Sequence, residues 1–118
     1  MKTSIDDIQP YETKDGSMIR ELMHPEVHDC RNISLAMAEI GPGKKTALHH
    51  HICSEEIYHI VMGEGSMTLG TQEFAIGKGD TVLIRPGMSH QVKNTGKKVL
   101  KILCCCAPPY SHSDTKIM

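Results

Sequence analysis

The feature of this sequence that most constrains its fold is the regular spacing of chain breakers. Turn-forming residues recur about every eight to twelve positions, and the runs between them are short and alternate between apolar and polar residues. No stretch has the sustained apolar repeat and capped start of a long helix. The rhythm predicts an all-β sandwich or barrel, with breakers at Asp15-Gly16, His24-Pro25, Gly41-Pro42-Gly43, Gly63, Gly65, Gly70, Gly77, Gly79, Pro86-Gly87, Asn94-Thr95-Gly96 and Pro108-Pro109.

The chain length suits one domain, and the absence of an internal repeat argues against two barrels in tandem. We expect residues 1–16 to form an N-terminal arm, residues 17–107 the barrel and residues 108–118 a C-terminal tail. Any helix should be short and peripheral. Strands are predicted at residues 17–23, 32–40, 45–51, 56–62, 65–70, 72–76, 81–84, 89–94 and 97–106.

Composition excludes several classes of partner. The net charge is −1, neither end carries a run of like charges, and the chain has one Phe and no Trp, so nucleic acid is not an expected partner. No segment approaches the roughly 20 apolar residues that span a bilayer, and the N-terminus lacks the apolar core of a signal peptide. Three of the five cysteines are consecutive, which suits reduced thiols better than a disulfide framework. We therefore expect a cytoplasmic protein without a membrane partner.

Histidines and glutamates gather in one short segment, GPGKKTALHHHICSEEIYHIVMG, between Gly41 and Gly63. Side chains alternate faces along a strand, so His49 and His51 should point together while His50 points away. If the next strand folds back as an antiparallel hairpin, Glu56 can face the two imidazoles. A third imidazole, His90, follows a Pro-Gly turn in the run GDTVLIRPGMSHQVKN.

These two segments resemble the paired motifs of the cupin family. The first motif, G-x5-H-x-H-x4-E-x6-G, is matched at every fixed position, by Gly43, His49, His51, Glu56 and Gly63. The second, G-x5-P-x-G-x2-H-x3-N, is matched by Gly79, Gly87, His90 and Asn94, with Arg85 in place of its proline and Pro86 beside it. Fifteen residues, 64 to 78, separate the motifs, as in compact single-domain members of the family.

The resemblance implies a cupin-type double-stranded β-helix, that is, a jelly-roll barrel with one divalent transition metal ion. Carried over residue by residue, it makes His49, His51, Glu56 and His90 the metal ligands. Three neutral imidazoles and one carboxylate suit Fe, Mn, Co, Ni or Zn, and are too rich in nitrogen for Mg or Ca. Small cupins also resemble one another in forming homodimers through an N-terminal strand, a role for which residues 1–23 are available.

Cupins act as dioxygenases, isomerases and lyases, so the resemblance favours a metal-dependent enzyme with a small-molecule substrate in the barrel. A non-catalytic protein that binds a metal or a sugar-like small molecule is the alternative, and a metal store is a third reading. Tyr58 and Glu55 are the candidate catalytic residues, because either could move a proton near the metal. Glu55 is also the alternative carboxylate ligand, but only Glu56 has the motif's spacing to Gly63.

The cysteines near these residues have two readings. If Lys101 faces solvent, Cys104 and Cys106 point inward, where small core residues are the plainer interpretation and cavity-lining thiols the other. Cys53 lies on the loop beside the ligands and could be redox-sensitive. His50 and His59 are expected to point out of the barrel, and Asn94 to fix a turn.

Overall fold

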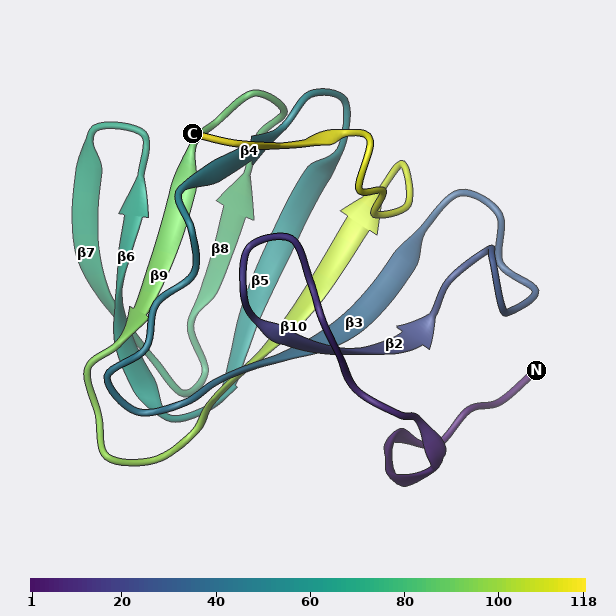
Figure 1. Ribbon diagram of the computed structural model, residues 1–118, viewed down its shortest axis with the longest axis horizontal. Helices are drawn as coiled ribbons and strands as arrows, with labels where there is room; N and C mark the ends of the chain where they lie inside the picture. Colours follow the sequence, from purple (N-terminus) through teal and green to yellow (C-terminus); the bar gives the residue numbers. More distant parts are fainter.

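The computed structural model describes all 118 residues as two antiparallel β-sheets packed face to face in a jelly-roll barrel (Figure 1). A single 3-10 turn, η1 (Ile5–Asp7), precedes the strands, and no helix has the length and apolar character needed to cross a membrane. The six-stranded sheet has the order β1 (Tyr11–Glu12), β2 (Met18–Met23), β3 (Ser34–Ile40), β10 (Leu100–Ala107), β5 (Glu55–Met62) and β8 (Thr81–Ile84). The five-stranded sheet has the order β11 (Thr115–Ile117), β4 (His49–His51), β9 (His90–Asn94), β6 (Glu64–Leu69) and β7 (Gln72–Gly77).

The all-β prediction is confirmed, and each of the nine predicted strands is present. The largest differences lie at two strand starts. The strand predicted at 45–51 begins only at His49, because the preceding residues follow β9 as an irregular segment in which the Thr46 amide donates to the Val92 carbonyl at 2.9 Å. The strand predicted at 97–106 begins at Leu100.

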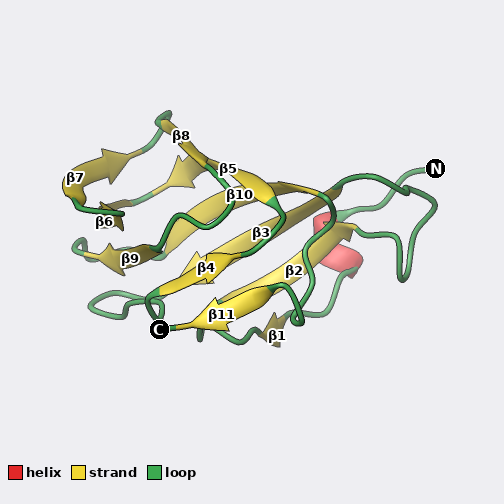
Figure 2. Ribbon diagram, turned by 90° about the horizontal axis from the view of Figure 1, so that it is seen from above, coloured by secondary structure: helices red, strands yellow, loops and turns green.

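The hairpin expected between the histidine strand and the glutamate strand is wrong. β4 belongs to the five-stranded sheet and β5 to the six-stranded sheet, so the residues between them cross from one layer to the other (Figure 2). The cross-over is tied down by Asp114, whose carboxylate accepts from the amides of Cys53 and Ser54 at 2.9 and 3.1 Å. Glu56 therefore faces the imidazoles across the barrel interior and not along one sheet.

The segments expected to be an arm and a tail are both built into the barrel. In the N-terminal segment β1 pairs with β2, and in the C-terminal segment β11 pairs with β4, with Thr115 opposite His51. β2 in turn pairs with β3 of the same chain, and β1 forms the edge of this sheet. Short strands are hard to predict from the sequence because two or three residues carry no readable alternation.

The core lies between the sheets and follows the alternation of the strands. Every second residue is buried from Glu56 to Ile60 on β5 and along the whole of β10, which confirms the inward placement expected for Cys104 and Cys106. Ile60, Met67 and Leu100 are fully buried, and Phe74 packs at the margin of the same cluster. The interior of the barrel also contains buried polar side chains.

The two motif residues Gly63 and Asn94 fix the turns at one end of the barrel. Gly63 joins β5 to β6 with a φ of +89°, and a Cβ there would lie 2.9 Å from the Val99 carbonyl oxygen, so a side chain would be both strained and crowded. The Asn94 side chain is buried and donates to the carbonyls of Ile40 and Lys98 at 2.9 and 2.7 Å. The predicted turn-fixing role of Asn94 is confirmed.

Candidate metal centre

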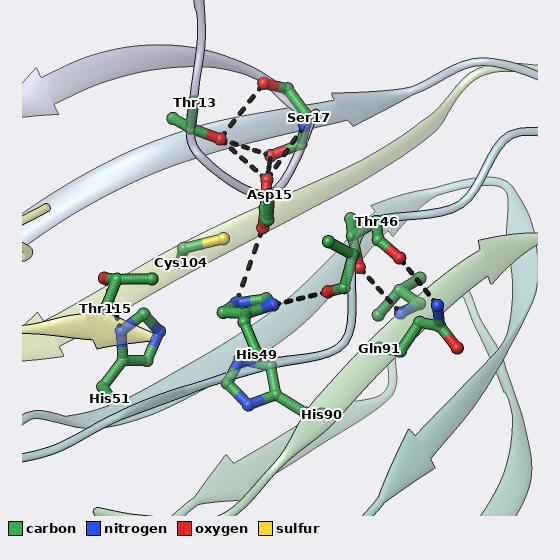
Figure 3. A network of polar contacts seen from close by, with 12 residues as sticks. Thr13, Asp15, Ser17, Thr46, His49, His51, His90, Gln91, Cys104 and Thr115 are labelled. Atoms are coloured by element: carbon green, nitrogen blue, oxygen red, sulfur yellow. Dashed lines mark hydrogen bonds and ion pairs between the residues drawn. The ribbon is translucent and has the colours of Figure 1, made fainter. Parts of the chain in front are cut away.

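Three buried imidazoles meet on the inner face of the five-stranded sheet. His49 and His51 lie on the same face of β4, and His90, the first residue of β9, is the direct cross-strand partner of His49. The exposed fractions of the three are 2%, 4% and 0%, and the ring centroids of His49 and His90 are 4.1 Å apart (Figure 3). The predicted pairing of His49 with His51, and their meeting with His90, are therefore present in the fold.

Each imidazole uses its Nδ1 atom to bond to the protein, which leaves Nε2 pointing into the barrel. His49 Nδ1 lies 2.7 Å from the Ala47 carbonyl oxygen, and His90 Nδ1 lies 3.0 Å from the Met88 carbonyl oxygen. A carbonyl only accepts, so both Nδ1 atoms carry the proton. In the neutral form of each ring Nε2 then carries the lone pair, and this is the form that binds a metal.

The tautomer of His51 is fixed by Thr115 on β11. His51 Nδ1 lies 3.0 Å from Thr115 Oγ1, and the Thr115 hydroxyl donates its one proton to the Ser111 carbonyl at 2.8 Å. Since that proton is already used, the hydroxyl oxygen accepts from His51 Nδ1–H. A residue in the segment expected to be a tail thus sets the orientation of a predicted ligand.

Glu56 approaches the imidazoles from the opposite sheet. Its Oε1 atom lies 3.2 Å from His51 Nε2 and 3.6 Å from His90 Nε2, and its Oε2 atom accepts from the Cys106 thiol at 3.0 Å. Burial alone would raise the pKa of Glu56, but the hydrogen bonds and charge that His51 and His90 supply when both of their ring nitrogens are protonated, with the Cys106 hydrogen bond, lower it to about 2. Burial and the Glu56 charge raise the pKa of Cys106, so this thiol stays protonated as a donor.

The donor atoms in this cluster lack partners of their own. His51 Nε2, His90 Nε2 and Glu56 Oε1 are buried polar atoms without a hydrogen bond, although buried polar atoms are nearly always paired. The three imidazoles offer nitrogen atoms within 4.8 Å of one another, close enough to share one ion. Acceptors that converge without a proton between them need a cation, so the residues present fit a divalent metal.

A second carboxylate, which the sequence did not single out, lies beside the cluster. Asp15 Oδ2 is 3.5 Å from His49 Nε2, and Asp15 Oδ1 accepts from Thr13, from the Ser17 amide and from the Ser17 hydroxyl (Figure 3). Burial, followed by the charge of His90, lowers the pKa of His49, which keeps that ring neutral beside Asp15. Asp15-Gly16 appears in the sequence only as a breaker, so nothing in the pattern places it over the barrel.

The cluster lines one part of a cavity of about 40 Å³, which has room for about three water molecules. Tyr58 lies in its wall, on the same face of β5 as Glu56, and burial followed by the Glu56 charge raises its pKa well above the ordinary value. Its hydroxyl is therefore a protonated donor group. Glu55 is exposed on the outer face of β5, so a role for this residue in moving a proton inside the cavity has no support from its position.

The other residues singled out in the sequence lie away from the cluster. His59 is exposed and bonds to Thr81 at 2.8 Å, while His50 is half-buried and pairs with Lys116. Cys53 is exposed on the cross-over segment. Cys104 is buried and belongs both to the apolar core and to the cavity wall, so the two readings of this cysteine describe the same position.

The hydrogen bond between His51 and Thr115 can be tested by mutation. We expect Thr115→Val to weaken metal binding by about 10–100-fold, because valine keeps the shape but removes the oxygen that holds the His51 tautomer. Competition with a chromophoric chelator measures the affinity. Thr115→Ser, which keeps the hydroxyl, is the matched control and should stay within threefold of the unsubstituted protein, roughly the scatter of such contributions. Equal metal affinity in the valine and serine variants would contradict the role of Thr115 in fixing the His51 tautomer.

Comparison with known proteins identifies the family. A family model described as the cupin domain matches residues 36–106, more than half of the chain. The chain therefore belongs to the cupin family, in agreement with its two motifs and its jelly-roll barrel. It is 52% identical over 118 residues to the uncharacterized protein MJ1618 of Methanocaldococcus jannaschii, with all of this chain and 94% of that protein covered.

Proteins of known structure that share this fold catalyse different reactions. Oxalate decarboxylase of Lactobacillus farciminis, in a formate complex, superposes with a TM-score of 0.82 at 24% identity, over 96% of this chain and 34% of that one. Pac13 of Streptomyces, a nucleoside dehydratase, superposes with a TM-score of 0.81 at 14% identity, over 100% of this chain and 90% of that one. At these identities the likeness shows the fold alone. The barrel itself does not select a reaction.

Proposed function

We propose that the protein is a mononuclear transition-metal enzyme, a dioxygenase or a metal-dependent isomerase or lyase, that binds a small-molecule substrate in the barrel beside the metal. The observation that carries this proposal is the convergence of unpartnered buried acceptors, His51 Nε2, His90 Nε2 and Glu56 Oε1. His49, the third member of the imidazole cluster, completes a proposed ligand set of three imidazoles and one carboxylate.

The donor set favours a reactive site over a structural one. Structural zinc sites are closed by four protein ligands, usually with cysteine, whereas an ion with six ligands keeps two positions for substrate beside His49, His51, Glu56 and His90. When bound, such a metal supplies Lewis acidity or redox chemistry to a coordinated oxygen-bearing substrate. Iron, manganese, cobalt, nickel and zinc all suit these donors.

The chain's own residues prepare the cavity for this chemistry. Tyr58 holds its proton at the phenolic oxygen and can donate it, or a hydrogen bond, to a substrate at the proposed metal. Ile19, Ala38, Val92 and Ile102 give the cavity an apolar wall that offers water no hydrogen-bond partner. A dry wall strengthens the electrostatic effect of each polar group that faces the substrate.

The second candidate is a non-catalytic protein that binds a metal or a small ligand. One observation favours it: the cavity lined by His49, His51 and Glu56 has a volume of about 40 Å³, which leaves space for only a few non-hydrogen atoms. As an enzyme, the protein must therefore widen the cavity to admit a substrate. The Thr13–Ser17 turn contributes three residues to the wall of this cavity, and its Asp15 lies 3.5 Å from His49.

Turnover by metal-loaded protein separates the two candidates. Protein loaded with Fe, Mn, Co, Ni or Zn is incubated with diketones, catechols, thiols and sugars, and followed by oxygen uptake and by NMR. We expect at least one metal form to convert one compound faster than the free ion does, and Tyr58→Phe to slow that conversion about 100-fold with unchanged metal content. Metal-loaded protein that binds compounds from this panel but converts none would support the binding protein.

We also propose that the protein is a homodimer, with the outer face of the six-stranded sheet as its interface. Ile57 and Leu83 are cross-strand partners on β5 and β8, with exposed fractions of 43% and 50%, and Cys105 faces Ile57 from β10. Contiguous apolar residues on a sheet face are typical of a surface covered by a second subunit.

We further propose that the protein acts in the cytoplasm, where its cysteines stay reduced.

A further inference from the structure

Three carboxylates line the cavity around the cluster, and the only basic side chains in its wall are the imidazoles of His49 and His51. Nineteen residues line it, among them Asp15, Glu21 and Glu56, and none is lysine or arginine. Lys14, the neighbour of Asp15, is turned away, because its ammonium group donates to the Thr115 carbonyl at 2.8 Å. Any ligand beside the proposed metal therefore meets negative charge that no protein cation offsets.

Glu21 adds an acceptor that the protein does not use. Its Oε1 atom accepts from the Tyr11 hydroxyl at 2.6 Å, while its Oε2 atom is buried and has no partner. Glu21 lies on β2, in the six-stranded sheet, and Asp15 lies on the turn that precedes this strand. Both carboxylates belong to the N-terminal segment, whereas Glu56 reaches the cavity from β5.

The titration of nearby phenols is consistent with this field. Burial, assisted by the charges of Asp15, Glu21 and Glu56, raises the pKa of Tyr110 to about 12. Tyr110 lines the cavity next to His51, with ring centroids 5.9 Å apart. The interior therefore disfavours a further negative charge, and the phenols there remain neutral donors.

From this arrangement we infer that the ligand is a small molecule without net negative charge, which presents hydroxyl or amino donors to Asp15 and Glu21 while it chelates the metal. This inference rests on the proposed function. Three carboxylates outweigh the charge of one divalent ion, so a dianion would enter a cavity of its own sign. A hydroxyl or amino group would instead satisfy the free oxygen of Glu21, which otherwise stays buried and unpaired.

A series of two-carbon ligands of different charge tests this inference. Oxalate, ethylene glycol and protonated ethanolamine each have at least one oxygen that can bind the metal, but they are dianionic, neutral and cationic. Each is titrated into cobalt-loaded protein, and the visible spectrum of the bound cobalt gives its Kd. We compare the unsubstituted protein with Asp15→Asn/Glu21→Gln, which removes two charges and keeps the shape of each side chain and one of its two acceptor oxygens. The control is Glu12→Gln/Glu73→Gln, which removes two exposed charges outside the cavity.

We expect the cavity variant to bind oxalate at least tenfold more tightly and ethanolamine at least tenfold more weakly, with glycol changed less than threefold. The control should match the unsubstituted protein. Glu21→Gln alone leaves the Thr13–Ser17 turn intact, and should shift both charged ligands in the same directions by at least threefold. Unchanged Kd values for oxalate and ethanolamine in both cavity variants would overturn the inference. Failure of the unsubstituted protein to bind cobalt would instead overturn the proposed function, and this inference with it.

Discussion

Replacing His51 and His90 together by alanine is expected to abolish metal binding. Protein purified without chelator should contain about one equivalent of a first-row transition metal, and the double variant less than about a tenth, because loss of two ligands exceeds the 10–100-fold cost of losing an outer partner. Both Nε2 atoms are buried, unpartnered and directed at Glu56, so each has a metal-binding role available and no other. Elemental analysis measures the metal content.

The chain supplies a matched control for this experiment. His50 and His59 lie on the same two strands as predicted ligands but outside the cluster, so His50→Ala/His59→Ala removes two imidazoles and should keep full occupancy. Circular dichroism shows whether each variant keeps its sheets. A folded His51→Ala/His90→Ala variant with full metal content would remove the ligand assignment.

In the metal-free protein, the contribution of Glu56 to the free energy of unfolding is expected to fall by about 3 kcal/mol as the pH drops from 4.5 to about 2. Other carboxyl groups add their own contributions. The folded protein holds the pKa of Glu56 near 2, against an ordinary value of 4.5. The unfolded chain therefore takes up this proton first. The stabilisation is complete above pH 4.5 and is lost as the pH falls through 2.

Urea unfolding at a series of pH values measures this loss in protein freed of metal by a chelator. Glu56→Gln cannot ionise at this position, so the difference between its stability and that of the unsubstituted protein should vanish progressively across this pH window. Taking the difference removes the contribution of other carboxyls, among them Asp114, whose pKa is also lowered by its hydrogen bonds to Ser54 and Cys53. Glu55→Gln, one residue away on the exposed face, should retain the full pH dependence. Parallel curves for the Glu56 and Glu55 variants would contradict the prediction.

The three imidazoles could be predicted from the sequence because strand alternation is a local rule. His49 and His51 share a face wherever a strand contains both, and the His90 motif follows its own turn. Alternation also separates Glu56 from Glu55, as the burial of one and exposure of the other show. The position of Glu56 opposite the imidazoles was predicted for a wrong reason, since no local rule tells that the chain changes sheets between β4 and β5.

The partners of the cluster could not be predicted, because they depend on contacts between distant segments. Thr115 meets His51 across 64 residues, and Cys106 meets Glu56 across 50. Threonine is not a metal-site signal, and the sequence predicts that Cys106 points inward without indicating that it donates to Glu56. Asp15 is harder still, since a turn that carries an aspartate and a glycine is the commonest kind of breaker. The contacts of these side chains with the cluster follow only from the register of the strands.

The contact between β11 and β4 has a consequence for how the centre forms during synthesis. Thr115 leaves the ribosome long after His49, His51 and His90, so a growing chain already contains every imidazole while His51 Nδ1 lacks its acceptor. An ion captured at that stage would meet a ring whose tautomer and orientation are unset. Correct metal loading is thus expected to follow the docking of the last strand, and to act as a late step in maturation.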